Sequence, residues 1–303
     1  MSNQFGNVYY NTIGTYLKRE FGCKIMKLSL ECGFTCPNRD GTKGVGGCIF
    51  CSASGSGDFA SDIPGQIELL KKKWPTGKYI AYFQSYTNTY APVEILRQKY
   101  EEALRYPGVV GIAIATRPDC LSQEVLELLN ELNQKTFLWV ELGLQTIHED
   151  TALLINRCYP LATFDEAMRN LTTLQIKTVV HLILGLPGET REDMFCSLKY
   201  ICEKNIFGLK LHMLNVLKNT QLASFYPDKL SIPTMEDYIK LTVDLLEIIP
   251  PNITIHRLTA DAPRNLLIAP EWSYKKHSIL NGINKELRQR KSYQGKLLDK
   301  DNL

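Results

Sequence analysis

Residues 163–205 read TFDEAMRNLTTLQIKTVVHLILGLPGETREDMFCSLKYICEKN, and the apolar pattern changes twice within this stretch. Residues 163–175 and 190–205 place apolar side chains three or four positions apart, which is the spacing of an amphipathic helix. Residues 176–186 form a continuous apolar run rich in β-branched side chains, which is typical of a strand buried on both faces. Helix, buried strand and helix in succession predict a parallel sheet whose strands are joined by helices.

The same alternation extends in both directions along the chain. Five further apolar runs predict strands, and segments of helical periodicity, such as residues 91–106 and 122–134, lie between them. Because 303 residues with 44% hydrophobic content can bury one barrel-sized core, we expect a single parallel sheet of six strands. The further strand runs are KIMKLSL from Lys24, KYIAYFQ from Lys78, VVGIAIAT from Val109, FLWVELGL from Phe137 and FGLKLHML from Phe207.

Segments with chemically active residue types follow the predicted strands. They are a cysteine-containing loop after the first strand, then QSYTNTY, TRPDC, ELGLQT, LGLPGE and LNVLKNT. In barrel-like α/β folds, function is built at the carboxyl ends of the strands. We therefore expect the cysteine-containing loop to lie at the active edge and not in the core.

Composition excludes several classes of protein. The N-terminal residues MSNQFGNVYY have neither the basic start nor the apolar core of a secretory signal, and the longest apolar run, near residues 178–186, is far short of the ~20 residues of a membrane span. We therefore expect a soluble, cytoplasmic protein whose nine cysteines are metal ligands or buried thiols. A net charge of only +3 means that any nucleic-acid surface must be a local patch.

Four cysteines lie close together after the first predicted strand. Cys32, Cys36, Cys48 and Cys51 have the C-x3-C and C-x2-C hooks of a four-cysteine zinc site, and spacing alone favours zinc. The last three, within CPNRDGTKGVGGCIFC, also suit a four-iron four-sulfur cluster, because three thiolates leave one iron open for a reacting ligand. Phe50 would pack over such a cluster. On the residues alone, both metals remain possible.

The cysteine segment resembles the cluster motif of radical S-adenosylmethionine (radical SAM) enzymes. Other motifs agree with this resemblance and follow in order: YFQSYTNTYAP, ATRPDC, VELGLQT, HLILGLPGET and HRLTADAPRNLLIAP. The chain is most similar to the YhcC/YtqA-type group, and more distantly to the radical domain of Elp3 and to coproporphyrinogen dehydrogenases. The resemblance implies an α/β fold, a partial (β/α)6 TIM-like barrel with a C-terminal extension. We expect the core barrel over residues 1–250, and over residues 251–303 an extension that packs on it and ends in a basic tail.

The resemblance also implies the cofactors. Cys36, Cys48 and Cys51 would hold a 4Fe-4S cluster, as metal ligands and catalytic residues, and S-adenosylmethionine (SAM) would bind the open iron. Reductive cleavage of SAM would give methionine and a 5′-deoxyadenosyl radical that abstracts a hydrogen atom from the substrate. An electron donor such as ferredoxin or flavodoxin would supply the electron. A deep barrel suits this chemistry because it excludes water and competing reactions.

Further cofactor-binding residues follow from the resemblance, position by position. Where relatives carry a Gly-Gly-Glu turn, this chain has residues 84–88, in which Thr87 and Asn88 offer oxygen acceptors. Glu141 resembles the carboxylate that holds the ribose hydroxyls, and Gln145 would contact either the ribose or the substrate. The other assignments are Phe50 over the cluster, Gln84 in the turn, Arg157 for the methionine carboxylate, and Gly185 and Gly188 where the backbone meets the adenine.

Two further residues are candidates for catalysis. His181 lies in an otherwise apolar strand, where a catalytic histidine and a core histidine bonded to a carbonyl are equally good interpretations. Arg117, in TRPD, would hold the substrate or cofactor, or would cap a neighbouring loop.

The resemblance to Elp3 favours tRNA as substrate and partner. Because the chain lacks the acetyltransferase domain of Elp3, we expect it to remodel the carboxymethylaminomethyl group of a wobble uridine, as an MnmL-like tRNA-modifying enzyme would. The alternatives are a small-molecule or peptide substrate, or a zinc-binding nucleic-acid module without chemistry. Basic and aromatic side chains in the C-terminal part suit phosphate contact and base stacking, although a solvated helix and tail would carry them equally well. These residues are Arg257, Arg264, Trp272, Tyr274, Lys275, Lys276, Lys285, Arg288, Arg290, Lys291, Tyr293 and Lys296.

Overall fold

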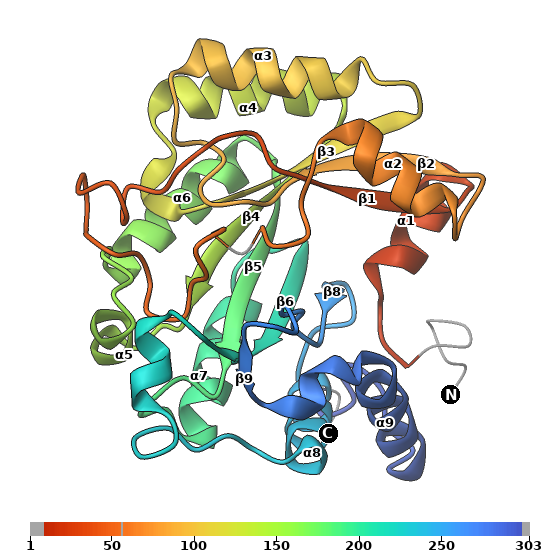
Figure 1. Ribbon diagram of the computed structural model, residues 1–303. Helices are drawn as coiled ribbons and strands as arrows, with labels where there is room; N and C mark the ends of the chain where they lie inside the picture. The colour runs from red at the N-terminus through yellow and green to blue at the C-terminus, as the bar shows by residue number, and fades with distance from the viewer. Residues whose placement is uncertain (1–8, 56, 299–303) are drawn as a thin grey trace.

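A curved sheet of parallel strands forms the centre of the molecule (Figure 1). The computed structural model describes residues 9–55 and 57–298. Within them, seven strands pair in the order β1-β2-β3-β4-β5-β6-β8, each parallel to its neighbours. The sheet curves into a partial barrel, so the predicted α/β fold is confirmed. The strands are β1 (Ile25–Leu30), β2 (Lys78–Phe83), β3 (Val109–Thr116), β4 (Phe137–Gln145), β5 (Lys177–Leu184), β6 (Gly208–Met213) and β8 (Thr254–Arg257).

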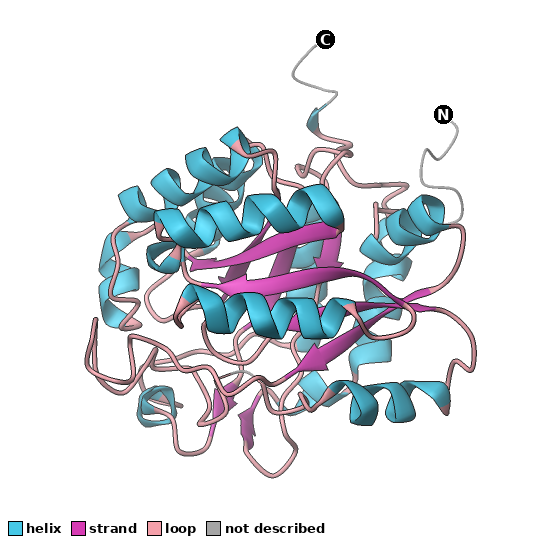
Figure 2. Ribbon diagram, turned by 90° about the horizontal axis from the view of Figure 1, so that it is seen from above, coloured by secondary structure: helices cyan, strands magenta, loops and turns pink. Residues whose placement is uncertain are grey.

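Helices cover the convex side of the sheet (Figure 2), and several of them begin at a side chain that caps the first turn. The Ser122 hydroxyl accepts from the Val125 amide at the start of α4, and Thr190 and Asp193 form a capping box at the start of α7. The helices predicted from periodicity are confirmed as α3, α4, α6 and α7. The helices are α1 (Ile13–Phe21), α2 (Ile63–Lys71), α3 (Val93–Leu104), α4 (Gln123–Lys135), α5 (Glu149–Leu154), α6 (Leu161–Thr173), α7 (Arg191–Cys202), α8 (Met235–Leu246) and α9 (Lys276–Gln289), with short 3-10 turns η1 (Pro118–Cys120), η2 (Gln221–Phe225) and η3 (Glu271–Tyr274).

The predicted number of six strands is wrong, because β8 adds a seventh to the described sheet. Its residues TIHR are few and half of them are charged or aromatic-polar, so they lack the apolar run of a buried strand. Pairing with β6 makes this segment a strand: Gly208 lies opposite Thr254, and Leu209 lies opposite Ile255. The tertiary partner therefore overrides a weak local pattern.

The inner side of the barrel is divided into an apolar layer and a polar layer. Near the amino ends of the strands, inward-facing apolar side chains pack with Leu17 of α1 and close the barrel from below. Two residues further along β4 and β5, the inward positions carry Glu141 and His181. Because side chains alternate across a strand, these positions share a face with the apolar layer. The apolar layer contains Ile25, Ile80, Ala113, Trp139 and Val179, and it contacts Tyr82 and Ala115, which line the cavity.

A small antiparallel sheet and η2 hold the loop after β1. In this sheet β7 (Val216–Leu217) pairs with β9 (Leu267–Ala269). Ile49 is buried against this sheet and η2, and its carbonyl accepts from the Leu222 amide at 2.9 Å. The Ile49 amide donates to the Ile155 carbonyl at 3.1 Å. The loop is therefore tied to two parts of the barrel that are distant in sequence.

The C-terminal residues pack on the barrel. Ile279, Ile283 and Leu287 form a fully buried stripe on α9, which packs against α8. Gln294 is also fully buried, and its side-chain nitrogen donates to the carbonyls of Pro250 and Ile253. Apolar positions four residues apart and a buried amide therefore anchor the described part of this segment, and the predicted extension with its basic tail stays a prediction.

The division at residue 250 stays a prediction, since β8 follows it and joins the same sheet. Residues 1–8 and 299–303 of the two predicted regions lie outside the described residues. Across residues 9–55 and 57–298, the helices are too short or too polar to span a membrane.

Candidate active site

The partial barrel encloses a cavity of about 770 Å³. The loop after β1, the carboxyl-end halves of β2 to β6 and the segment from Arg257 to Lys276 all contribute to its wall. Seven Lys and Arg side chains line it against three Asp and Glu side chains, so the cavity favours anionic ligands. The charged lining residues are Arg39, Arg117, Arg157, Lys210, Arg257, Arg264 and Lys276, with Asp58, Glu141 and Asp261.

Three cysteines of the loop line this cavity. Cys36, Cys48 and Cys51 come together here although eleven residues separate the first two, because the loop folds back on itself. The Cys51 amide donates to the Cys48 carbonyl at 2.9 Å, which forms a tight turn around Phe50. Burial and, to a smaller extent, the nearby Cys51 raise the pKa of the Cys48 thiol to about 12. A metal that binds Cys48 must therefore displace its proton.

Asn38 supports the buried cysteine. Its side chain is fully buried, and its nitrogen donates to the Cys48 sulfur at 3.6 Å and to the Asn156 carbonyl at 2.5 Å. Its side-chain oxygen is buried without a hydrogen-bond partner among the described residues. Three thiols on one cavity wall, with an amide donor behind one of them, fit a cluster held by three thiolates.

Cys32 lies apart from the other three. It does not line the cavity, and it packs instead against the main hydrophobic core. Burial raises the pKa of Cys32 to about 11, and the charges that act on it come from Lys99, Glu31 and Glu102. The structure thus divides the four cysteines into a group of three and a separate core thiol. In the described part of the chain, no three His, Cys, Asp or Glu side chains converge closely enough to hold a single metal ion.

The predicted cofactor residues near β2 and β4 divide into two groups. Phe50, Gln84, Thr87 and Gln145 line the cavity with the cysteines. Asn88 does not line it: the residue is fully buried, and its side-chain nitrogen donates to the Ala115 carbonyl at 2.9 Å. Asn88 therefore joins the turn after β2 to β3, and the cofactor contacts of all five residues stay predictions.

Gly185 and Gly188 lie in the turn after β5, outside the set of cavity-lining residues. Both have positive φ values, 83° and 84°, a conformation that glycine adopts without steric cost. The backbone conformation of the turn therefore accounts for glycine at both positions. Their contact with an adenine stays a prediction.

Arg157 is held almost entirely by the protein. It is 1% exposed, and its guanidinium donates to the carbonyls of Leu144, Thr146 and Tyr159 and to the Glu149 carboxylate. These bonds fasten the segment after β4 to the start of α6. Arg157 still contributes to the cavity wall, and its contact with a methionine carboxylate stays a prediction.

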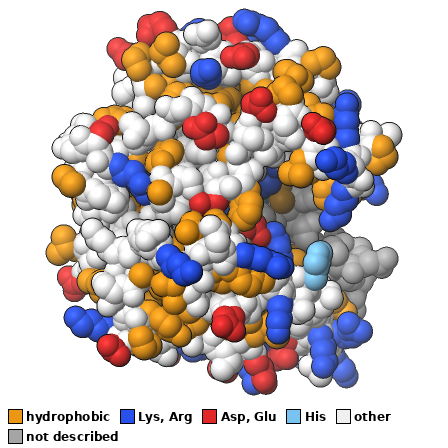
Figure 3. Space-filling model, viewed as in Figure 1, with side chains coloured by type: hydrophobic (Ala, Val, Ile, Leu, Met, Phe, Trp, Pro, Cys, Tyr) orange, Lys and Arg blue, Asp and Glu red, His pale blue; other side chains and the backbone are white. Residues whose placement is uncertain are grey.

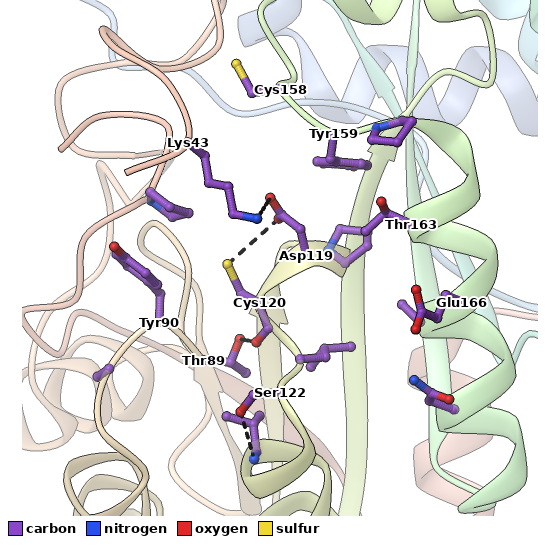
Figure 4. A pocket seen from close by; sticks show the side chains of 18 of the residues that line it. Lys43, Thr89, Tyr90, Asp119, Cys120, Ser122, Cys158, Tyr159, Thr163 and Glu166 are labelled. Atoms are coloured by element: carbon purple, nitrogen blue, oxygen red, sulfur yellow. Dashed lines mark hydrogen bonds and ion pairs between the residues drawn. The ribbon is translucent and has the colours of Figure 1, made fainter. Parts of the chain in front are cut away.

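Arg117 forms a bidentate ion pair with Asp119. Its Nε and one Nη lie 2.9 Å from the two carboxylate oxygens, and its guanidinium stacks on the Tyr159 ring. Figure 4 shows a second cavity of about 800 Å³, which Asp119 and Lys43 of the cysteine loop both line, with their charged atoms 4.0 Å apart. Arg117 thus lines the inner cavity with its charge largely compensated. Its substrate or cofactor role stays a prediction.

The polar layer of the barrel is a network around Glu141. This carboxylate is fully buried and accepts from Trp139 Nε1 at 2.8 Å, from His181 Nε2 at 3.0 Å and from Lys210 Nζ. Lys210 also donates to the Tyr82 hydroxyl at 2.8 Å. Burial alone would raise the pKa of Glu141, but Lys210 and His181 hold it well below its usual range. Glu141 is therefore ionised and its oxygens already have partners, so its ribose role stays a prediction.

Lys210 and Tyr82 were not predicted as functional residues. Lys210 interrupts the apolar run FGLKLHML just as Glu141 interrupts FLWVELGL, so the same signal was present in the sequence. A charged side chain within a buried strand needs a partner of opposite charge. Glu141 of β4 and Lys210 of β6 are each other's partner. This pairing can be recognised only once both strands are placed in one barrel.

Three partly buried histidines predict a pH-dependent stability. Burial lowers the pKa of His181 to about 4, and burial holds those of His212 and His256 well below the usual 6.5. The folded protein keeps these rings neutral, whereas the unfolded chain binds protons below about pH 6.5, so stability falls as the pH decreases from 6.5. We expect the free energy of unfolding to decrease by about 1 kcal/mol per histidine between pH 6.5 and 5.5. Urea denaturation at the two pH values measures this difference.

The variant His256→Gln should remove about a third of that pH dependence, because the other two histidines remain. His256 lies between the rings of Trp139 and Phe207, with centroids 5.6 Å away, and outside the cavity lining. An unfolding free energy that does not change between the two pH values would contradict the assignment of neutral buried rings.

Sequence comparison identifies the family. Residues 34–200 match the Radical SAM superfamily, and residues 206–289 match the Radical SAM C-terminal domain. The chain is 49% identical over 300 residues to YtqA of Bacillus subtilis. The aligned residues are 96% of this chain and 93% of YtqA. It is also 37% identical over 271 residues to YhcC of Escherichia coli. This alignment covers 86% of this chain and 87% of YhcC.

Two more distant similarities concern part of the chain. The tRNA uridine(34) acetyltransferase of Dehalococcoides mccartyi is 26% identical over 185 residues, which are 60% of this chain and 39% of that protein. The structure of Elp3 from Methanocaldococcus infernus, with its N-terminus deleted, superposes with a TM-score of 0.62 at 19% identity, covering 76% of this chain and 58% of that chain. The second similarity is one of fold. With three cysteines on one wall of a parallel-strand half-barrel, and matches over nearly its whole length, this chain belongs to the radical SAM superfamily as an enzyme of the YtqA/YhcC type.

Proposed function

We propose that this radical SAM enzyme acts on tRNA and converts the carboxymethylaminomethyl group of a wobble uridine into an aminomethyl group. The observation that carries the proposal is the position of the three-cysteine loop over a deep, positively charged cavity. Substrates with phosphate and carboxylate groups suit such a cavity. The relative named tRNA uridine(34) acetyltransferase supports the nucleoside and its position.

Family membership implies a 4Fe-4S cluster and SAM. We assign Cys36, Cys48 and Cys51 as the cluster ligands, with Phe50 packed beside them. When bound, these groups supply a 5′-deoxyadenosyl radical that removes a hydrogen atom from a C–H bond, with the first electron from a ferredoxin or flavodoxin. The protein surrounds this chemistry with the walls of the barrel, so that water and other hydrogen donors are excluded.

The proposed reaction is an oxidation of the carboxymethyl arm followed by hydrolysis. With both groups bound, the carbon next to the amine would lose one hydrogen atom and one electron, for which SAM and the cluster would supply the acceptors. The resulting iminium adds water, the C–N bond breaks, and the products are the aminomethyl base and glyoxylate. Overall the substrate loses one hydrogen atom, one electron and one proton, and gains the elements of water.

The C-terminal segment supplies groups for holding the nucleic acid. Arg257, Arg264 and Lys276 line the cavity, and Tyr274 lies between them with its ring under the Arg264 guanidinium. Cations and an aromatic ring at a cavity wall suit phosphate contact and base stacking. Figure 3 shows Lys and Arg side chains across the middle of the viewed face and along its right-hand edge, mixed with acidic side chains. A base of a single-stranded loop could enter the cavity at low cost, since it need not be unpaired from a duplex.

Mass spectrometry of wobble nucleosides in total tRNA tests the proposal. Cells without the gene should accumulate the carboxymethylaminomethyl form and lose the aminomethyl form and its derivatives. The wild-type gene should restore the normal profile, whereas a gene encoding Cys48→Ala should not. Identical nucleoside profiles with and without the gene would reject tRNA as the substrate and leave a small molecule or a peptide as the alternative.

A further inference from the structure

Lys210 is a buried lysine that faces the reaction cavity. It lies on β6 with a side chain only 3% exposed, and it contributes to the cavity lining together with Tyr82, Glu141 and His181. The Tyr82 hydroxyl and the Glu141 carboxylate accept two of its three possible hydrogen bonds. The remaining position on Nζ has no protein partner among the described residues. Two hydrogen bonds therefore hold the Lys210 nitrogen in place at the inner end of the cavity.

The surroundings of Lys210 disfavour its positive charge. Burial lowers its pKa to about 7, with smaller lowering contributions from Lys27 and Arg257 and against the opposing effect of Glu141. A buried lysine that is half neutral near physiological pH is suited to accept a proton. The titratable and charged groups that face it are Lys27 from β1, Tyr82 from β2, Glu141 from β4, His181 from β5, His212 from β6, and His256 and Arg257 from β8.

The other groups of this layer do not replace Lys210 as a base. Glu141 is ionised but has no free oxygen facing the cavity, since Trp139, His181 and Lys210 occupy it. His181 donates Nε2–H to the Glu141 carboxylate, because an ionised carboxylate only accepts, and burial holds its ring pKa near 4. A ring of such low basicity takes a proton from an amine far less readily than a neutral lysine does.

The proposed reaction needs a base before the hydrogen atom is removed. The secondary amine of a carboxymethylaminomethyl group is protonated in neutral water, as alkylamines are. A protonated nitrogen has no lone pair with which to stabilise a radical on the neighbouring carbon or to form the iminium. The proton must therefore leave the nitrogen inside a cavity from which water is excluded.

We propose that Lys210 accepts this proton and is a catalytic residue of the enzyme, with Tyr82 and Glu141 as its positioning residues. The inference rests on the proposed function, because it assigns the substrate amine as the proton donor. The N–H bond of the substrate ammonium breaks, its electron pair stays on the substrate nitrogen, and a new N–H bond forms on Lys210. The hydrogen atom still goes to the deoxyadenosyl carbon and the electron to the oxidised cluster, so that the proton taken by Lys210 completes the balance.

The test compares the wild-type holoenzyme with Lys210→Met between pH 6.5 and 9.5. The substrate is tRNA from cells without the gene, and the assay measures tRNA-dependent 5′-deoxyadenosine and the aminomethyl nucleoside. The wild-type rate should rise up to tenfold per pH unit below about pH 7 and level off above it. Lys210→Met should be about 100-fold slower at pH 7 and should recover toward the wild-type rate by pH 9.5, where the substrate amine loses its proton unaided.

Two controls separate catalysis from folding. Iron content and the far-UV circular dichroism spectrum should be the same in Lys210→Met and wild type, which shows that the variant folds and can hold its cluster. If Lys210→Met does not fold, the double variant Glu141→Gln with Lys210→Met removes both buried charges and should show the same recovery at high pH. Tyr82→Phe keeps the ring and removes one positioning contact, so its rate at pH 7 should fall about tenfold with the same pH profile.

Three outcomes overturn the inference. A rate of Lys210→Met that is equally reduced at every pH shows a structural role, and an unchanged rate at pH 7 shows no role. Wild-type enzyme that cleaves SAM but never responds to this tRNA overturns the proposed function itself, and with it the amine that Lys210 would deprotonate. The first two leave the proposed function standing, because the wild-type product is still formed.

Discussion

Replacement of Cys36, Cys48 or Cys51 by Ala is expected to remove the iron–sulfur cluster and to abolish SAM cleavage. The three thiols line one cavity wall, and a cluster that keeps one iron open for SAM needs all three. Loss of one thiolate leaves two irons without a protein ligand, and the remaining sites then bind the cluster too weakly to retain it. Iron and sulfide analysis of anaerobically purified protein, together with 5′-deoxyadenosine formation, measures both effects.

Cys32→Ala is the matched control for this series. Cys32 packs in the main core, away from the cavity, so its replacement removes a small buried side chain and leaves the cluster in place. We expect full iron content, full SAM cleavage and a modest loss of stability. Loss of iron in Cys32→Ala with retention in Cys36→Ala would contradict the ligand set, and stoichiometric zinc in the wild type would favour the four-cysteine site.

Glu141→Ala is expected to destabilise the fold by about 3–5 kcal/mol at pH 7, because it leaves a buried lysine without its counter-ion. The carboxylate is fully buried and holds Lys210, His181 and Trp139, so its removal leaves three donors without their acceptor. Loss of its proton makes Lys210 neutral and so reduces the free-energy cost of the unpaired buried charge. The destabilisation should therefore be smaller at pH 9 than at pH 7. Denaturant unfolding at both pH values measures it.

The control for this variant keeps the shape and removes the charge. Glu141→Gln retains an acceptor oxygen for one donor, and combined with Lys210→Met it leaves no unpaired charge in the barrel. The double variant should recover most of the stability lost in Glu141→Ala, since replacing a buried ion pair by neutral groups costs little. A destabilisation of Glu141→Ala below about 1 kcal/mol would mean that water reaches this layer and that the ion pair contributes little.

Loss of SAM affinity in a well-folded Glu141→Gln variant would support the ribose contact that the sequence suggests. The structure gives both oxygens of Glu141 partners inside the protein, so this contact requires a rearrangement of the network. Isothermal titration with SAM on the reconstituted variant distinguishes the two roles, because a purely structural Glu141 leaves the affinity of the folded protein unchanged.

The sequence by itself determined the architecture and the family, and it predicted three cysteines as the ligands of a cluster. Six apolar runs with intervening helical periodicity specify a parallel sheet, because each strand must be covered on both faces and each crossover must return to the same edge. Short-range spacing was also enough to identify Cys48 and Cys51 around Phe50, since neighbours in sequence are neighbours in space. These patterns are local, so they can be recognised without knowledge of the fold.

Only the tertiary structure decided which distant residues share a site. Lys210 and Glu141 are 69 positions apart, and the curvature of the sheet brings β6 and β4 to face each other with Tyr82 of β2 beside them. Pairing with β6 likewise made a strand of the polar segment TIHR. Cys36 lines the cavity whereas Cys32 packs against the main core, a difference that cysteine spacing does not encode. The energy of a buried charge depends on every group around it. No single segment of the sequence could therefore reveal that Lys210 pairs with Glu141 at the inner end of the cavity.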